Sequence, residues 1–121
     1  MAGHLQSEST SGSGLTPAQL RKLRARLLET RKETLARLHD EETTARSSES
    51  LAEPMDAAEL AREQGDAAEQ TGRFRARLGE IDDALARLDS GRYGVSERSG
   101  QPIGFDRLAA VPWARFAAEE E

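Results

Sequence analysis

The segment LAREQGDAAEQTGRFRARLGEIDDALARL, residues 60–88, decides the expected fold of this chain. Its less polar side chains recur in alternating steps of four and three residues, which is the spacing of a coiled-coil seam. The seam positions are Leu60, Gln64, Ala67, Thr71, Phe74, Leu78, Ile81, Leu85 and Leu88. A helix with such a seam is expected to pack against a second amphipathic helix that covers it.

The partner is expected upstream, in a helix that begins at residue 16. Thr16 can serve as the N-cap, Pro17 suits the first turn, and Gln19 occupies the capping-box position. A broad stripe at helical spacing follows, formed by Leu20, Leu23, Leu27, Leu28, Arg31, Leu35 and Leu38. These features predict a first helix over residues 16–45.

A turn over residues 46–55 is expected to join the two helices. Three serines and Pro54 interrupt the helical pattern there, and proline disfavours helical geometry at the residue before it. The second helix is then expected over residues 56–90, with Gly91 as its C-terminal cap. The prediction is an all-α fold built on a long antiparallel two-helix coiled-coil hairpin over residues 15–91.

The two ends of the chain differ in character. Residues 1–14 are polar, lack periodicity and end in Ser-Gly-Ser-Gly, so a flexible tail is expected. Residues 92–121 hold most of the aromatic surface of the chain and are expected to form a small C-terminal knob with a short terminal helix. We find no apolar run that resembles a membrane span or a secretory signal, so a cytoplasmic protein is expected.

The composition excludes several classes of protein. With 36% hydrophobic and 4% aromatic residues among 121, the chain cannot build a thick globular core. A charged fraction of 32% favours long amphipathic helices. The net charge of -5 argues against direct DNA binding and favours a protein partner. Because there is no cysteine, and because His4 and His39 are far apart in sequence, no metal site is expected.

Three glycines in the second helix allow two interpretations. Gly65, Gly72 and Gly79 recur every seven residues beside the seam, although each should cost about 1 kcal/mol relative to alanine. They indicate either a close approach of two backbones along that edge or tolerated substitutions on a half-exposed flank.

Charge gathers around the expected turn. Between residues 40 and 63 there are eight acidic residues against two arginines. The beginning of the first helix is basic, and antiparallel pairing would match part of that charge with the acidic residues 80–83. The acidic turn has no such match. A solvated charged end is the simplest interpretation, and a docking end for a partner is the alternative.

The C-terminal segment RYGVSERSGQPIGFDRLAAVPWARFAAEEE, residues 92–121, carries a motif of known spacing. Its Tyr-Gly step, Pro-Ile step and Arg-Leu-x-Ala-x-Pro run resemble the zinc finger of the DksA/TraR family, in which two Cys-x-x-Cys pairs flank this framework. The four cysteine positions of the family fall on Ser96, Ser99, Ala117 and Glu120. The resemblance therefore implies a degenerate, zinc-finger-like knob that lacks every zinc ligand.

A second motif, Glu53-Pro54-Met55-Asp56-Ala57-Ala58, resembles the coiled-coil tip motif of the same family, Asp-x-x-Asp-x-Ala. The resemblance implies a transcription regulator that binds RNA polymerase through its secondary channel and modulates initiation with an acidic tip. The tip effectors that it implies are Glu53, Asp56 and Ala58. It also implies polymerase contacts by Arg73, Arg75 and Arg77, which are otherwise ordinary surface arginines.

The resemblance and the charges together predict no cofactor. Zinc is expected from the family but its ligands are absent, and tight binding of the alarmone ppGpp is not expected. The reason is electrostatic repulsion, because acidic residues occupy the relevant part of the second helix and the chain end: Glu80, Asp82, Asp83, Glu119, Glu120 and Glu121. A monomer is expected.

The sequence leaves a second class of function open and disfavours a third. The second class is a zinc-free coiled-coil protein-interaction module redirected to a non-polymerase partner, which is suggested because both motifs depart from the family pattern. An enzyme is not expected, because carboxylates on a thin two-helix hairpin lack the concave, desolvated pocket that shifts the pKa of a catalytic group.

Overall fold

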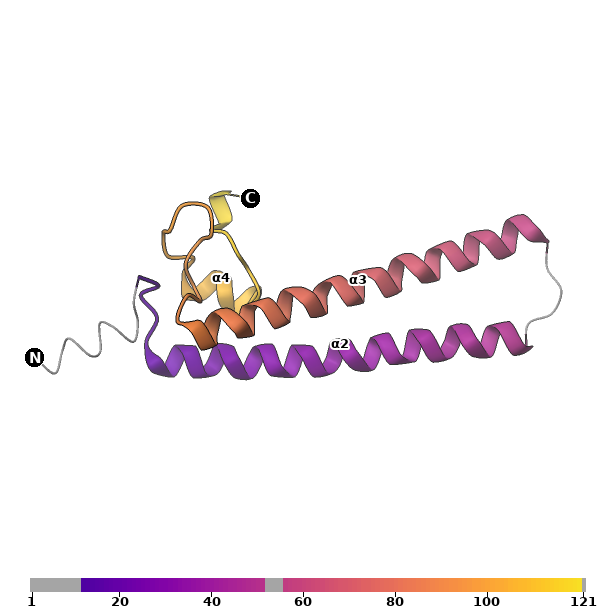
Figure 1. Cartoon of the computed structure of the whole chain (residues 1–121), viewed down its shortest axis with the longest axis horizontal. Helices are drawn as coiled ribbons and strands as arrows, with labels where there is room; N and C mark the ends of the chain where they lie inside the picture. The colour runs from indigo at the N-terminus through magenta and orange to yellow at the C-terminus, as the bar shows by residue number, and fades with distance from the viewer. Residues whose placement is uncertain (1–11, 52–55, 121) are drawn as a thin grey trace, which may run out of the picture. The chain divides into compact units, whose positions relative to one another are not determined.

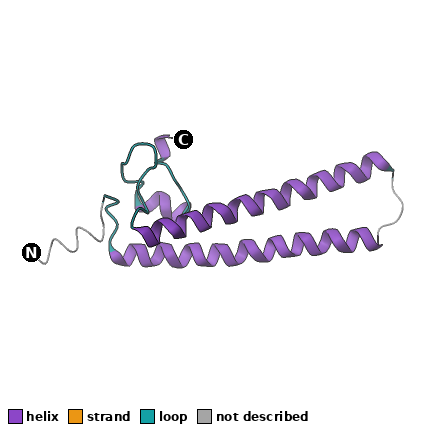
Figure 2. Ribbon diagram, viewed as in Figure 1, coloured by secondary structure: helices purple, strands orange, loops and turns teal. Residues whose placement is uncertain are grey.

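The computed structural model describes residues 12–51 and 56–120 of the chain (Figure 1). Two long α-helices, α2 (Pro17–Leu51) and α3 (Ala57–Ser90), are followed by the short α4 (Phe105–Ala110) and the 3-10 turn η1 (Ala118–Glu120). The described residues form no β-strand (Figure 2). Their only β-type pairing is an isolated antiparallel bridge between Val95 and Pro102. The predicted all-α fold with two long helices and a small C-terminal region is confirmed.

The chain divides into two compact units, one formed by residues 1–30 and 80–121 and the other by residues 31–79. In each unit an ion pair joins α2 to α3: Arg24 with Asp89 in the first, Arg75 with Glu42 in the second. In both units an α2 segment runs antiparallel to an α3 segment (Figure 1). The predicted hairpin pairing is therefore present in each unit. None of the described helices has the length and apolar content needed to cross a membrane.

The start of α2 forms as the sequence predicts. The Thr16 backbone N–H donates to Gln19 Oε1 at 3.0 Å, and the Gln19 backbone N–H donates to Thr16 Oγ1 at 3.1 Å. This reciprocal pair is a capping box, which satisfies backbone donors that the first turn of a helix leaves unpaired. Leu15 just before the cap is buried, and Leu20 packs against the same apolar cluster.

The end of α2 differs from the prediction. The helix continues to Leu51, so the turn expected over residues 46–55 is wrong for its first six positions. Serine costs at most about 0.7 kcal/mol relative to alanine in a helix, so loss of the apolar pattern does not by itself end one. The stronger break signal, Pro54, lies outside the described residues, as do the other positions from 52 to 55.

The seam of α3 is confirmed over most of its length. Ile81 is fully buried and Leu78 is half-buried, whereas the neighbouring Arg77 is exposed, so the predicted register is right. Towards the start of the helix the pattern weakens, because Leu60 is 41% exposed and Gln64 is also exposed. The seam is therefore covered from Ala67 onward.

The predicted stripe of α2 needs correction at two leucines. Leu28 and Leu35 are exposed, at 49% and 40%, whereas Thr34 is buried. The buried positions Leu23, Leu27 and Thr34 share one face of the helix, and each of the two exposed leucines follows a buried position by one residue. One residue rotates a helix by about 100°, which carries both leucines off the buried face.

The glycines of α3 lie on an open face. A methyl group built on Gly65, Gly72 or Gly79 would meet no atom within 4 Å, and all three positions are exposed. The close-approach interpretation is therefore wrong within this chain. The glycines stand on a flank that would accept a larger residue.

The first unit contains the apolar core. Its buried side chains form one cluster of Leu15, Leu23, Leu27, Ile81, Ala84, Tyr93, Ile103, Leu108 and Ala114. The cluster joins both long helices to α4 and to the segment that follows it. Tyr93, Ile103 and Leu108 are the C-terminal side chains of this cluster that are most buried, at 8% exposure or less together with Ala114 at 5%.

Part of the predicted N-terminal tail belongs to this core. Ser13 is only 5% exposed, and its Oγ accepts a hydrogen bond from the Leu15 backbone N–H at 3.3 Å. Gly94 leaves space for the Ser13–Leu15 segment, because a Cβ atom on residue 94 would lie 2.8 Å from Leu15 Cδ1 and 3.0 Å from Ser13 Cβ. The expectation of a flexible tail is thus wrong for residues 12–14, and residues 1–11 lie outside the described ranges.

The end of α3 is closed by Gly91, as predicted. Gly91 has φ +76°, a left-handed conformation that glycine adopts without a steric penalty. The Arg92 N–H donates to the Arg87 carbonyl at 2.9 Å and the Gly91 N–H to the Leu88 carbonyl at 3.3 Å. These two bonds form a Schellman motif, which ends the helix and turns the chain into the C-terminal region.

We predict that Leu27→Ala lowers the free energy of unfolding by about 2 to 5 kcal/mol, because it leaves a cavity where a fully buried side chain stood. The matched control is Leu28→Ala, at the adjacent position with a 49% exposed side chain, which should change stability by less than about 0.5 kcal/mol. Urea denaturation followed by far-ultraviolet circular dichroism measures both. Equal losses in the two variants would show that the assignment of the buried face is wrong.

Candidate functional site

Asp56 stands at the beginning of α3 and caps it. The Glu59 backbone N–H donates to Asp56 Oδ1 at 2.8 Å, and the Leu60 N–H donates to the Asp56 carbonyl at 3.0 Å. A carboxylate in this position satisfies a free backbone donor and interacts favourably with the positive end of the helix dipole. Asp56 is nevertheless exposed, so its carboxylate remains accessible to a partner.

The other two predicted tip residues are only partly placed by the structure. Ala58 is an exposed residue in the first turn of α3, two positions after Asp56. Glu53 lies outside the described residues, so its predicted role stays a prediction.

The three predicted arginine contacts are all exposed on α3, but they have different surroundings. Arg75 forms the ion pair with Glu42 of α2. Arg73 donates to Gln70 Oε1 on its own helix at 2.8 Å. Arg73 and Arg77 are four residues apart and so share one face of the helix. Arg75 therefore has its partner on α2, whereas the printed partner of Arg73 lies on its own helix.

An open groove beside Arg75 was not predicted. It lies between α2 and α3 of the second unit and has a volume of about 480 Å³. Three alanines and a threonine make up half of its lining residues, and charged or amide side chains make up the other half: Ala45, Ala67, Ala68 and Thr71, with Glu42, Arg46, Gln64 and Arg75. The alanines at seam and flank positions were the sequence signal, because they are too short to fill the space between two helices.

The four positions that correspond to zinc ligands in the family come together in the first unit. Ser96 Oγ donates to Glu120 Oε1 at 2.5 Å, and Ser99 Oγ donates to Glu120 Oε2 at 2.6 Å. The Glu120 backbone N–H donates to the Ala117 carbonyl at 2.9 Å, within the turn η1. We name the three hydrogen-bonded side chains Ser96, Ser99 and Glu120 the carboxylate cluster.

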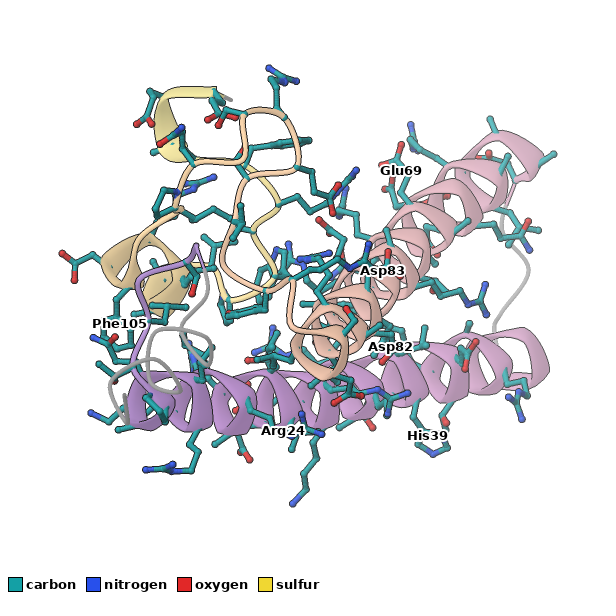
Figure 3. The ribbon with its side chains drawn as sticks, turned by 60° about the vertical axis from the view of Figure 1, so that its left-hand side comes forward. Arg24, His39, Glu69, Asp82, Asp83 and Phe105 are labelled. Carbon is teal, nitrogen blue, oxygen red and sulfur yellow. The ribbon has the colours of Figure 1, made fainter. Side chains whose placement is uncertain are left out.

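These residues do not fit a zinc ion. Structural zinc sites use four ligands drawn mainly from thiolates and imidazoles, whereas these positions offer two hydroxyls, one carboxylate and a methyl group. In the part of the chain that the structure describes, no group of three or more His, Cys, Asp or Glu side chains could hold a metal. His39 is an exposed side chain on α2 (Figure 3).

The carboxylate cluster favours the ionised form of its acid. The hydrogen bond from Ser96, and next the one from Ser99, lower the pKa of the Glu120 carboxyl below its ordinary value. Arg98 adds a contact to the same segment, because its guanidinium donates to the Glu120 carbonyl at 2.9 Å. The Arg98 guanidinium carbon also lies 4.9 Å from the centre of the Phe116 ring, in a cation–π arrangement.

A buried arginine that the sequence analysis missed anchors the C-terminal region to α3. Arg87 is only 8% exposed and lies 3.5 Å from Glu97 Oε2 and from the carbonyls of Trp113 and Ala114. Glu97 also pairs with Arg115, at 2.8 Å. In the sequence Arg87 looks like an ordinary helix-surface arginine. No sequence signal marked it, because Arg87 is not one of the predicted seam positions.

Of the acidic residues on which the expectation against a polyanionic ligand depends, Glu80, Asp82 and Asp83 lie on α3, and Glu121 lies outside the described residues. Asp82 and Asp83 are exposed side chains on α3 (Figure 3). The pKa of Arg115 is raised mainly by the hydrogen bond that its guanidinium donates to Glu97, and the negative charges of Asp83 and Glu80 raise it further. The charge of Arg115 is therefore already balanced by carboxylates of its own unit.

Sequence comparison gives two informative relatives. No family model matches the chain. An uncharacterized protein of Aquifex aeolicus is 36% identical over 104 residues, covering 83% of this chain and 72% of that protein. The RNA polymerase-binding transcription factor DksA of Caulobacter vibrioides is 43% identical over 49 residues, covering 40% of this chain and 34% of that protein.

A solved structure is similar over almost the entire chain. The structure of transcription factor DksA2 from Pseudomonas aeruginosa matches with a TM-score of 0.71 and 31% sequence identity, covering 99% of this chain and 92% of that chain. Identity and coverage of this extent show a common family as well as a common fold.

Tyr93 allows a spectroscopic test of the C-terminal core. It is the only tyrosine in the chain, its hydroxyl donates to the Pro112 carbonyl at 2.8 Å, and burial raises its pKa against the opposing charge of Arg87. The pKa of Tyr93 in the folded state exceeds its unfolded value of about 10, so burial of the protonated phenol contributes to stability. That contribution is fully present below about pH 10. It is lost as the pH rises further. We predict that tyrosinate absorbance appears well above pH 10, together with loss of the fold.

The control is the same titration in concentrated urea, where Tyr93 should ionise at about pH 10. Ionisation near that pH with an intact circular dichroism spectrum would contradict the buried position.

Proposed function

Because this chain belongs to the DksA/TraR family, we propose that it binds bacterial RNA polymerase and regulates the initiation of transcription. The observation that carries the proposal is the likeness to DksA2, at 31% identity over 99% of this chain. The Caulobacter vibrioides relative, whose name states RNA polymerase binding, adds support. The proposed activity is regulatory rather than enzymatic, and its place is the cytoplasm, where the polymerase acts.

We propose that the helical hairpin enters the secondary channel of the polymerase, with the residues between α2 and α3 leading. The support is an exposed carboxylate at the beginning of α3 in a motif that resembles the family's tip. Asp56 would act on a metal ion, an arginine or a lysine of the polymerase through charge-assisted hydrogen bonds. Glu53 and Ala58 complete the proposed tip. Capping and regulation are compatible, because a carboxylate has two oxygens and several acceptor sites.

Arg73 and Arg77 are the proposed contacts with the polymerase surface. They share one exposed face of α3, so a single acidic surface could engage both. Arg75 remains a candidate, but a contact with the polymerase would have to replace its ion pair with Glu42.

We further propose that the protein works as a monomer without zinc, without ppGpp and without touching DNA. The support is the poor fit of the carboxylate cluster to zinc and the acidic residues of α3 and η1. The net charge of -5 also disfavours direct contact with a nucleic acid.

The second candidate function is a hairpin module that binds a partner other than RNA polymerase. The observation that favours it is the replacement of all four zinc-ligand positions together with the first acid of the tip motif. A pull-down with purified bacterial RNA polymerase separates the two functions. Retention of the protein on the polymerase supports the first candidate, and absence of binding supports the second.

We predict that Asp56→Asn abolishes the effect on transcription while polymerase affinity stays almost unchanged. Asparagine keeps the shape and is itself a good N-cap, so the free energy of unfolding should fall by much less than the 0.5 to 2 kcal/mol or so expected for Asp56→Ala. In-vitro transcription with RNA polymerase measures the effect, and thermal unfolding measures the cap. The matched control is Asp66→Asn, which removes the same charge from another exposed site on α3. Full regulation by Asp56→Asn would rule out the tip-effector role.

We also predict that the purified protein contains no stoichiometric zinc and that a strong chelator leaves its melting temperature unchanged. The C-terminal region is held by its apolar cluster and its hydrogen bonds, neither of which depends on a metal. Elemental analysis and calorimetry provide the measurements. One zinc ion per chain, or a lower melting temperature in chelator, would contradict the proposal.

A further inference from the structure

The structure points to a replacement for the missing metal. We propose that the carboxylate cluster is a metal-free clamp in which the ionised Glu120 side chain ties the loop around Ser96 and Ser99 to the end of the chain. These residues do not fit a zinc site. Substitution of all four ligand positions would ordinarily leave the segment around Ser96 and the segment around Glu120 without a cross-link. The inference concerns the C-terminal region alone and holds whether or not the protein binds RNA polymerase.

The first half of the clamp is a compact turn. The Gly100 N–H donates to the Ser96 carbonyl at 2.9 Å, and the Ser99 N–H donates to Ser96 Oγ at 3.3 Å. Gly100 has φ +76°, so the turn uses a left-handed conformation that glycine provides. This arrangement places both serine hydroxyls on the same acceptor group.

The second half of the clamp is the turn η1. The Glu120 N–H bonds to the Ala117 carbonyl, and Ala117 is itself buried at 3% exposure. The backbone is thereby fixed three residues before the carboxylate. Each oxygen of the Glu120 carboxylate accepts a hydrogen bond from one serine hydroxyl, at 2.5 Å from Ser96 and 2.6 Å from Ser99.

The chemistry of the clamp suits its position. A hydrogen bond to an ionised acceptor is about twice as strong as one between neutral groups, so two of them on one carboxylate form a substantial cross-link. Ser96 is only 3% exposed, which shields its hydroxyl from competing water. Arg98 strengthens the same junction, because its side chain contacts both the Glu120 carbonyl and the Phe116 ring.

The clamp consists of polar side chains, whereas the core of the first unit is an apolar cluster. Ser96, Ser99 and Glu120 do not belong to the cluster that contains Ile81, Tyr93 and Leu108. Loss of the clamp should therefore release the loop locally while the helices and the core remain folded. A zinc finger is sensitive to chelators and to thiol oxidation, because each treatment removes its metal. This clamp contains neither a metal nor a thiol, so neither treatment should affect it.

Hydrogen exchange of the full-length protein, resolved to single amides by NMR, tests the clamp. In Glu120→Ala the amides of Ser99, Gly100 and Gln101 should exchange at least about tenfold faster than in the parent, and in Glu120→Gln by a smaller factor. The amides of α3 around Ile81 should keep their parent rates. The matched control is Glu119→Ala, which removes the same charge and side chain one residue earlier and should leave the loop amides unchanged.

A second variant tests whether the clamp occupies the place of the metal. S96C/S99C/A117C/E120C, purified under reducing conditions, should bind one zinc ion per chain, and zinc should slow loop exchange at least about tenfold, back to the parent rate. Without zinc its loop should exchange as fast as in Glu120→Ala. The proposal is overturned if the loop amides exchange at the same rate in Glu120→Ala as in Glu119→Ala. It is also overturned if the parent binds one zinc ion per chain, or if the folded four-cysteine variant binds none.

Discussion

The burial of one face of α2 against one face of α3 is the constraint on which the first unit depends. Leu23 and Leu27 from the first helix and Ile81 and Ala84 from the second are all at most 2% exposed and belong to one cluster. A coiled-coil seam of this kind derives its stability from mutual burial of apolar stripes, since helix propensity alone seldom holds a helix in water. The C-terminal region completes the cluster with Tyr93, Ile103 and Leu108, so it shares the core of the hairpin.

Sequence periodicity predicted the elements well because seams and caps are local properties. The capping box at Thr16, the Schellman motif at Gly91 and the register around Ile81 all follow from spacing along a single helix. The errors concern choices that spacing cannot make. A broad leucine stripe contains more candidates than one face can bury, and only the partner helix decides that Thr34 is inside and Leu35 outside.

The candidate sites show the same division. Motif spacing identified Ser96, Ser99, Ala117 and Glu120 as one set. It gave no reason to expect hydrogen bonds among the residues that replace the cysteines. Pairing across distant parts of the chain is invisible to a local pattern, which is why the buried Arg87 and its contact with Glu97 were missed. Ser13 was assigned to a tail for a related reason, because glycine and serine indicate flexibility unless a distant glycine such as Gly94 provides a place to pack.

The two units differ in how much they bury, and this difference bears on the proposed function. Over residues 31–46 and 56–79 of the second unit, Thr34 is the single buried side chain, whereas the first unit holds the whole apolar cluster. A helix pair with so few buried groups has little tertiary packing to transmit a change from one residue to the next. Substitutions at Asp56 or Arg73 should therefore act locally, through the surface that they alter. The packing that maintains the fold is therefore concentrated in the first unit.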